Sequence, residues 1–262
     1  MIQGQSFITE EKARGFTSVF RQQLSVVKYS QNPVIANSIY VHIDLHAGSG
    51  FNSEVGVIGS PVLFESTAHN LEFERYVLLC VEKDKHRIAE LGSRLQKNDR
   101  AFPHWGDNGE LCECVPDILR GHNIEPSNAV GSVLIDPNGF VDQIPWRQLD
   151  ELFKRCGRID VVFNFPGTAY TRNRAHSDHV DISELPKRMS KAHWFIREPL
   201  PTHKFTLCVG RNTDLLRIPE KLGSPFARWE SDKGSQYRNK AMMTSDELAA
   251  LPLRGQREFS FG

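Results

Sequence analysis

Short apolar runs alternate with amphipathic stretches along most of this 262-residue chain. The runs have the length and continuous apolar character of strands buried on both faces. They lie at 40–45, 76–81, 131–135 and 159–165, and a weaker run lies at 101–105. Segments with apolar residues at helical spacing lie between them, at 60–69, 88–95, 110–121 and 149–153. Strands and helices in strict alternation predict right-handed crossovers and a parallel sheet, which is an α/β fold.

Both ends of the chain depart from this alternation. Residues 8–27 predict an amphipathic helix that packs on the sheet, although a helix in this position can also cover a ligand. We expect a loop over 51–59, and Ser60 as the N-cap of the helix that starts with Pro61. The runs at 193–197 and 204–209 predict two last strands that form a hairpin. From Arg211 onward we expect mostly loop, with a helix at 244–251. The expected organisation is an N-terminal helix over 1–37, a core domain over 38–210 and an extension over 211–262.

The first strand runs directly into a glycine-rich turn, Asp44-Leu-His-Ala-Gly-Ser-Gly50. The dinucleotide fingerprint G-x-G-x-x-G is absent, because Ser53 stands where its third glycine would fall. The pattern D-x-x-x-G-x-G instead resembles the first motif of the class I S-adenosylmethionine (SAM) methyltransferases. That resemblance implies a Rossmann-like domain, mostly parallel with a C-terminal antiparallel hairpin and helices on both faces, that binds SAM.

Acidic residues follow four successive predicted strands: Asp44, Glu82, Asp107 and Asp136. Taken singly, each is equally well explained as a helix N-cap or a solvated turn. Together they favour SAM lying across the carboxyl edge of the sheet, with Glu82 on the ribose hydroxyls, Asp107 on the adenine amino group and Asp136 beside the methyl group. The predicted cofactor-binding residues are Asp44, His46, Ala47, Gly48, Ser49, Gly50, Glu82, Lys83, Asp107, Asn108 and Asp136.

Several further motifs resemble the three-Cys-motif partner (TcmP-like) proteins, a methyltransferase-like family often encoded in phage-like or mobile DNA. These motifs are Gly59-Ser-Pro61, Glu82-Lys-Asp84, Gly106-Asp-Asn108, Ile135-Asp-Pro-Asn-Gly139 and Val162-Phe-Asn-Phe-Pro166. The resemblance covers about residues 38–210. The chain departs from it at His46, where an aromatic residue is usual, and at Asn138, where one is common.

The turn Asp136-Pro137-Asn138-Gly139-Phe140 also resembles the (D/N)-P-P-(Y/F) turn of amino-group methyltransferases. There, polar groups orient an exocyclic NH2 and an aromatic ring stacks on an extruded base. The predicted catalytic residues are therefore Asp136, Pro137, Asn138, Phe140 and Asn164, the last at the end of the next strand. A tight Asp-Pro-Asn-Gly turn without any substrate is the alternative.

The net charge of zero hides an asymmetry, because residues 1–150 carry 13 basic and 19 acidic residues and the remainder carries 19 and 13. The basic half is either a nucleic-acid surface or a solvated face. On the first interpretation, the residues predicted to bind the substrate backbone are Arg172, Arg174, Lys187, Arg188 and Lys191.

Other features exclude further classes. No apolar run approaches the ~20 residues of a membrane span, and the first residues do not resemble a signal peptide. Five scattered cysteines predict a reducing, cytoplasmic setting. A nucleophile elbow, a P-loop and a zinc-ligand spacing are absent from the sequence, so no metal is expected. Three functions stay open: methyl transfer to a nucleic-acid base, with DNA adenine N6 favoured; methyl transfer to a protein or small molecule; or a non-catalytic, methyltransferase-like partner subunit in a phage or defence system.

Overall fold

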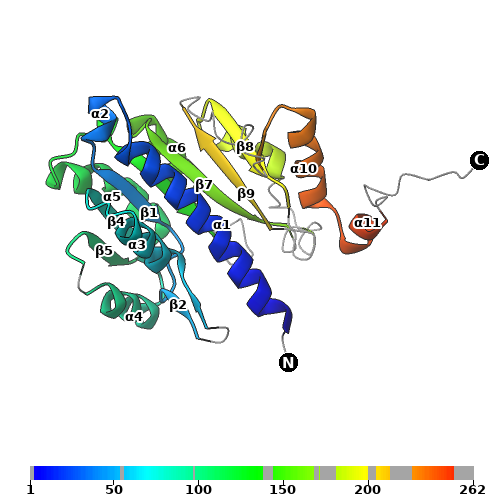
Figure 1. Ribbon diagram of the computed structural model, residues 1–262, viewed down its shortest axis with the longest axis horizontal. Coiled ribbons are helices and arrows are strands. Elements are labelled where there is room, and N and C mark those ends of the chain that lie inside the picture. The colour runs from blue at the N-terminus through cyan, green and yellow to red at the C-terminus, as the bar shows by residue number, and fades with distance from the viewer. Residues whose placement is uncertain are drawn as a thin grey trace, which may run out of the picture.

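An eight-stranded sheet organises the chain in the computed structural model, which describes residues 3–53, 56–96, 98–137, 144–167, 171, 181–199, 205–212 and 226–250. The order across the sheet is β10-β8-β9-β7-β6-β1-β4-β5 (Figure 1). In chain order the strands are β1 (Tyr40–Asp44), β4 (Tyr76–Glu82), β5 (Ala101–Trp105), β6 (Val130–Ile135), β7 (Ile159–Pro166), β8 (His193–Arg197), β9 (Phe205–Arg211) and β10 (Phe226–Arg228).

The pairings confirm the expected Rossmann-like α/β class. From β5 through β4, β1 and β6 to β7, each neighbouring pair is parallel. Beyond β7, β9 runs antiparallel to both β7 and β8, so β8 and β9 form the expected antiparallel hairpin. β10 then adds to β8 in antiparallel orientation. The sheet is therefore parallel in its centre and mixed at one side.

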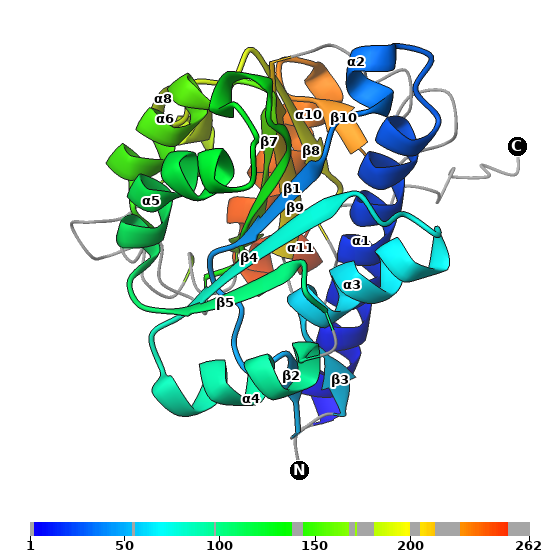
Figure 2. The ribbon, with the colours of Figure 1, turned by 90° about the vertical axis from the view of Figure 1, so that its left-hand side faces the viewer.

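Helices cover both faces of the sheet (Figure 2). Apolar residues of α1 (Gln3–Lys28), α3 (Ser60–Asn70) and α4 (Lys85–Leu95) build one core. Those of α5 (Asn108–Gly121), α6 (Trp146–Arg155), α8 (Leu185–Arg188) and α10 (Asp232–Met242) build the other. The remaining elements are α2 (Pro33–Ala36), α11 (Ser245–Ala249), the 3-10 turns η1 (Pro126–Asn128) and η3 (Ile182–Glu184), and a small hairpin of β2 (Phe51–Asn52) and β3 (Val57–Ile58).

The alternation of side chains along β1 sets up the candidate site. Val41 and Ile43 enter the core under α5 and α6. His42 points to the opposite face, where its ring stacks on Phe64 with centroids 4.2 Å apart. Because side chains alternate with a period of two, Asp44 faces the same side as His42, towards α1 and α3. The whole strand is buried, so its last residue is a carboxyl group held inside the protein.

Three local expectations were wrong. The N-cap of α3 is Gly59, not Ser60, because the Ser60 side chain turns to Asp44 instead. The loop expected over 51–59 contains the hairpin of β2 and β3. The two strands β8 and β9 are not the last, since β10 and α10 follow within the region expected to be mostly loop. α10 buries only Gly234, Tyr237 and Ala241, which is too narrow an apolar stripe to recognise in the sequence.

Candidate functional site

The order of the strands places a crevice between β1 and β6. The chain proceeds from β1 outward to β4 and β5, and then returns to the other side of β1 as β6 and β7. In open α/β sheets, ligands bind at such a reversal, outside the carboxyl ends of the strands. Asp44 ends β1 and Asp136 directly follows β6, so both lie at this crevice.

A cavity of about 520 Å³ opens at the same place. This volume lies within the roughly 300–1,000 Å³ range typical of small-molecule sites. Its wall combines the glycine turn, Asp136, and residues of α1, the β2–β3 hairpin, α3 and α4. The lining residues are Lys12, Ala13, Phe16, His46, Ala47, Gly48, Ser49, Gly50, Phe51, Asn52, Ser53, Ile58, Gly59, Ser60, Leu63, Arg87, Glu90 and Asp136.

Two glycines give the turn its shape for different reasons. Gly48 and Gly50 have φ values of +58° and +74°, in the left-handed region that favours glycine. A Cβ on Gly48 would meet nothing within 4 Å, so this position is open. A Cβ on Gly50 would lie 2.7 Å from Leu91 Cδ1, so a side chain there would collide with α4. At Gly48 the turn therefore exposes main chain, with no side chain over it, to open space.

Asp44 is an incompletely satisfied carboxyl group behind this turn. The residue is fully buried, and its Oδ1 accepts a hydrogen bond from the main-chain N–H of His46 at 3.0 Å. Its Oδ2 is enclosed and has no hydrogen-bond partner among the described residues. Burial raises the pKa of Asp44 to about 7, although the Ser60 side chain and the His46 N–H oppose the rise. A cationic or N–H donor at Oδ2 would favour the ionised form.

His46 joins three elements at the crevice. Its Nδ1 accepts a hydrogen bond from the main-chain N–H of Asp136 at 3.2 Å. Its other ring nitrogen, Nε2, lies 3.2 Å from Nδ2 of the Asn108 side-chain amide. Burial lowers the pKa of His46 to about 4, which keeps the ring neutral, so that Nδ1 can accept from Asp136. An apolar aromatic residue at this position could make neither contact.

Asp136, Asn164 and Lys12 form a connected polar group beside the cavity. Asn164 donates to Asp136 Oδ1 at 2.8 Å, which links the ends of β6 and β7. Lys12 reaches down from α1 and pairs with Asp136 Oδ2 at 2.5 Å. The side chains of Lys12 and Asp136 are 26% and 11% exposed, so the ion pair lies at the boundary between cavity and solvent. The side-chain oxygen of Asn164 is enclosed and has no partner among the described residues.

Of the four strand-end acids, Asp136 alone lines this cavity, and Asp44 is buried behind the glycine turn, whereas Glu82 and Asp107 make contacts elsewhere. Glu82 Oε1 accepts from the N–H of Asp84 at 2.9 Å. Asp107 caps α5, accepting from Gly109 N–H at 2.7 Å, and pairs through Oδ2 with Lys83 at 2.8 Å. Asp107 therefore has the helix-capping role that was the alternative explanation of a strand-end acid. Its assignment to adenine stays a prediction, as do those of Glu82, Lys83 and Asn108.

Only some of the residues predicted to act on the substrate lie near the cavity. Pro137 follows Asp136 at the crevice, whereas Asn138, Phe140, Arg172 and Arg174 lie outside the described residues. Lys187 is exposed.

Arg188 pairs with Glu184 at 2.8 Å and lies over the Trp146 ring. Lys191 is 7% exposed, and its Nζ donates to the main-chain oxygen of Ile159 at 2.6 Å. Ile159 begins β7, so Lys191 lies at the opposite edge of the sheet from Asp136.

The sequence did not identify several residues that line the cavity as ligand-site residues: Lys12, Phe16, Ser60, Arg87 and Glu90. Of these, Lys12 was the most predictable. It lies next to the apolar stripe of the N-terminal helix, which we expected either to pack on the sheet or to cover a ligand. Across the described ranges, no group of three His, Cys, Asp or Glu side chains is arranged to hold a metal ion. Nor does any described helix have the length and apolarity required to cross a membrane.

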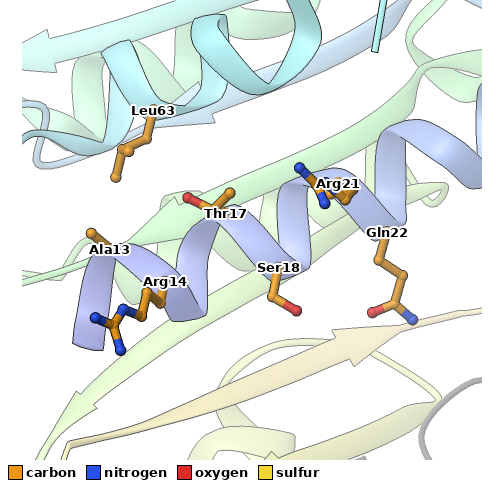
Figure 3. A pocket seen from close by; sticks show the side chains of 7 residues that line it. All are labelled: Ala13, Arg14, Thr17, Ser18, Arg21, Gln22 and Leu63. Atoms are coloured by element: carbon orange, nitrogen blue, oxygen red, sulfur yellow. The ribbon is translucent and has the colours of Figure 1, made fainter. Parts of the chain in front are cut away.

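A larger hollow of about 640 Å³ runs along the outer side of α1. Figure 3 shows its lining side chains, which come from α1 except for Leu63 of α3. None of these residues stands at the end of a strand, and Arg14 is already paired with Glu10 and Glu11. We therefore assign the candidate site to the smaller cavity, where the buried polar groups converge.

Comparisons with known proteins give fold-level likeness only. No protein-family model matches the chain, and no curated protein is similar to it in sequence. Among solved structures, protein LPL1258 from Legionella pneumophila is 12% identical with a TM-score of 0.49, covering 75% of this chain and 85% of that one. A methyltransferase from Geobacter sulfurreducens is 12% identical with a TM-score of 0.43, covering 78% and 79%.

The METTL16 MTase domain is 9% identical with a TM-score of 0.45, covering 74% of this chain and 67% of that one. TM-scores below 0.5 carry no argument about the site. The fold therefore rests on the order of the strands, and the site rests on its own geometry.

Proposed function

We propose that this protein is a SAM-dependent methyltransferase, and that its acceptor is an exocyclic amino group of a nucleic-acid base, with DNA adenine N6 favoured. One observation carries the proposal. Asp44 Oδ2 is enclosed and unpaired behind a glycine turn, at the reversal point of the sheet. A cationic ligand would satisfy this carboxylate, and SAM carries an ammonium group next to a carboxylate.

Different residues around the cavity would bind the two ends of this cofactor. Asp44 would accept from the ammonium group, and the main chain of the glycine turn would approach the same portion closely. Lys12 would pair with the carboxylate of the cofactor once it leaves Asp136. Glu82 would accept from the ribose hydroxyls and Asp107 with Asn108 would meet the adenine, as proposed from their positions at successive strand ends. When bound, SAM supplies an activated methyl group.

Asp136 and Asn164 are suited to orient an amino group. Asn164 donates to Asp136 Oδ1, so its own side-chain oxygen, which is enclosed, is left as an acceptor that a side-chain movement would have to uncover. If Lys12 turns to the cofactor, Asp136 Oδ2 becomes a second acceptor. Two acceptors on neighbouring strands match the two N–H groups of an exocyclic amine and would aim its lone pair. A strong general base is not required, because alignment with an activated methyl group supplies most of the rate.

Transfer of radiolabel from methyl-labelled SAM tests the proposal. The full-length protein is incubated separately with DNA, RNA and cell lysate, and incorporation into each fraction is counted. We expect label in DNA that falls steeply with added salt, because phosphate contacts release counterions. Asn164→Ala should lower incorporation about tenfold or more, whereas Glu151→Gln, on the exposed side of α6, should not. Label in protein or in a small molecule alone would refute the nucleic-acid acceptor while keeping the activity.

One observation favours a second candidate, a methyltransferase-like subunit that is not catalytic by itself. Lys12 already neutralises Asp136 at 2.5 Å, in the place where the acceptor would be oriented. On this reading the helix closes the site, and a partner protein is needed to open it. Absence of label in every fraction, together with binding of S-adenosylhomocysteine, would select this candidate. Absence of both would refute the two proposals together.

A further inference from the structure

A second cavity lies at the opposite edge of the sheet, where the parallel strands begin. It has a volume of about 450 Å³ and lies between α1, α2 and the first residues of β1, β6 and β7. In Figure 1, α2 is found at the end of α1 that is remote from the N-terminus. None of the residues lining this cavity also lines the candidate cofactor site. The two cavities are therefore separate.

A buried ion pair forms the inner polar part of the wall and contributes no net charge to it. Asp160 and Arg211 are 7% and 8% exposed and both line the cavity. Arg211 donates to Asp160 Oδ2 from Nε at 2.9 Å and from Nη2 at 2.5 Å. Gln23 Nε2 lies 3.5 Å from the same oxygen. The carboxylate of Asp160 is therefore neutralised inside the protein.

A further cation, Arg158, lines the same cavity. It directly precedes β7 and is exposed, so it lies where the cavity opens to solvent. Within the described ranges, its guanidinium has no hydrogen-bond or ion-pair partner. The two positive charges of Arg158 and Arg211 against the one negative charge of Asp160 leave a surplus of one positive charge, which belongs to Arg158.

Asn32 adds a second unused donor to this wall. Its Oδ1 accepts from the main-chain N–H of Val34 at 2.9 Å, which fixes the orientation of the amide. Its Nδ2 can only donate, and it has no partner in the part of the chain that the structure describes. Asn212, by contrast, makes hydrogen bonds through both its oxygen and its nitrogen. Two donors and one surplus positive charge suit an anion.

The remaining wall is largely apolar. It is formed by Val26 and Val27 of α1, Val34 and Ile35 of α2, and Val130 of β6. Apolar walls with a few polar groups are typical of small-molecule sites. Phosphate has no apolar part to place against this wall, and removing its charge from water would be costly. A carboxylate with an apolar body can leave its head at the solvent-facing Arg158 and bury only the body.

We propose that this cavity binds a monocarboxylate with an apolar body, such as an aryl or alkyl carboxylic acid. The carboxylate accepts hydrogen bonds from the guanidinium of Arg158 at the opening, and its single negative charge matches the surplus positive charge there. The apolar body packs against the valines of α1, α2 and β6. This site goes beyond the proposed methyl transfer and does not depend on it.

A titration of the full-length protein followed by valine-methyl NMR tests the proposal. The probes are benzoate and hexanoate, with benzamide and hexanamide as their neutral counterparts. We expect at least one carboxylate to shift the methyl signals of four lining valines, Val26, Val27, Val34 and Val130, and the tighter one identifies the body as aryl or alkyl. Its amide should bind about tenfold more weakly, because it lacks the charge that pairs with Arg158. Inorganic phosphate, an anion without an apolar body, should leave these signals unchanged.

Arg158→Met is the test variant, and Arg155→Met is its matched control. Both arginines are exposed, but Arg155 ends α6 and does not line the cavity. Both variants should keep the unfolding midpoint of the wild type. Arg158→Met should bind the carboxylate about tenfold more weakly, whereas Arg155→Met should bind it as the wild type does. The proposal is overturned if neither carboxylate shifts the valine methyls, if the amide binds as tightly, if phosphate produces the same shifts, or if the two variants bind equally.

Discussion

The two edges of the sheet each hold a buried carboxylate opposed by a cation, but the cation comes from different places. At the carboxyl edge, Lys12 reaches Asp136 from α1 and its side chain is 26% exposed. At the amino edge, Arg211 and Asp160 belong to β9 and β7, which are hydrogen-bonded neighbours, and both side chains are 10% exposed. The first pair can separate without disturbing the sheet. The second cannot, so we expect the first to act in ligand binding and the second in stability.

Arg211→Met should produce the largest effect, because it leaves the Asp160 carboxylate buried without its cation. Removing one partner of a buried pair costs about 3–5 kcal/mol. Urea unfolding at neutral pH measures the loss. Arg211→Lys, which keeps a cation, should lose clearly less. If the methionine variant lost less than about 1 kcal/mol of unfolding free energy, the Asp160–Arg211 pair would contribute no more to stability than an exposed pair, and the contrast between the two edges would be wrong.

Asp44→Asn should stabilise the protein in a pH-dependent way. Burial raises the pKa of Asp44 from 3.8 to about 7, so between these values the folded chain binds more protons than the unfolded chain. The wild type therefore loses stability as pH rises through this window, and an amide does not. The gain should be absent below about pH 4 and reach as much as about 4 kcal/mol above pH 7.

The measurement is the difference in unfolding free energy between the wild type and Asp44→Asn from pH 4 to pH 8. The difference cancels the opposite contribution of His46, whose pKa is lowered to about 4 and whose ionisation destabilises the fold as pH falls. A difference that stays constant across the window would mean that Asp44 is ionised throughout and already satisfied.

Lys12→Met should change stability least, by about 1 kcal/mol or less, because the pair is partly exposed and lies between a helix and a strand end. Its affinity for S-adenosylhomocysteine should nevertheless fall about tenfold, since the carboxylate of the ligand loses its cation. Fluorescence or calorimetric titration gives the affinity. Arg14→Met, which removes an exposed cation from the same helix, is the control and should bind as the wild type does. If Lys12→Met bound S-adenosylhomocysteine more tightly than the wild type, Lys12 would instead obstruct ligand binding.

The central strands β1, β4, β6 and β7 could be predicted from the sequence because each is buried on both faces and forms one apolar run. β1 and β7 are clear cases. β10 and α10 could not be predicted, because they depend on contacts between distant segments, such as the packing of Trp194 against Trp229 with ring centroids 5.9 Å apart. The spacing of apolar residues within one segment does not reveal such contacts.

The candidate site, like the fold, could be predicted only in part from the sequence. Asp44 and Asp136 could be placed together because the carboxyl ends of neighbouring parallel strands meet at one edge. Lys12 could not be assigned to Asp136, because the sequence does not fix how far along the sheet α1 docks. Lys191 was expected on a basic surface, but its ammonium is held by the main-chain oxygen of Ile159 beneath the Phe153 ring. Composition alone does not distinguish a buried lysine from a solvated one.

Calorimetric titration with S-adenosylhomocysteine at pH 6.5, repeated in buffers of different ionisation enthalpy, tests the central claim most directly. The ligand should bind at one site, and its ammonium should ionise Asp44, whose pKa is about 7. The proton released makes the observed heat vary with the buffer. Asp44→Asn should bind at least about tenfold more weakly and release no proton. No binding by the wild type, or binding that is equally tight and proton-neutral in both proteins, would contradict a cofactor site built around Asp44.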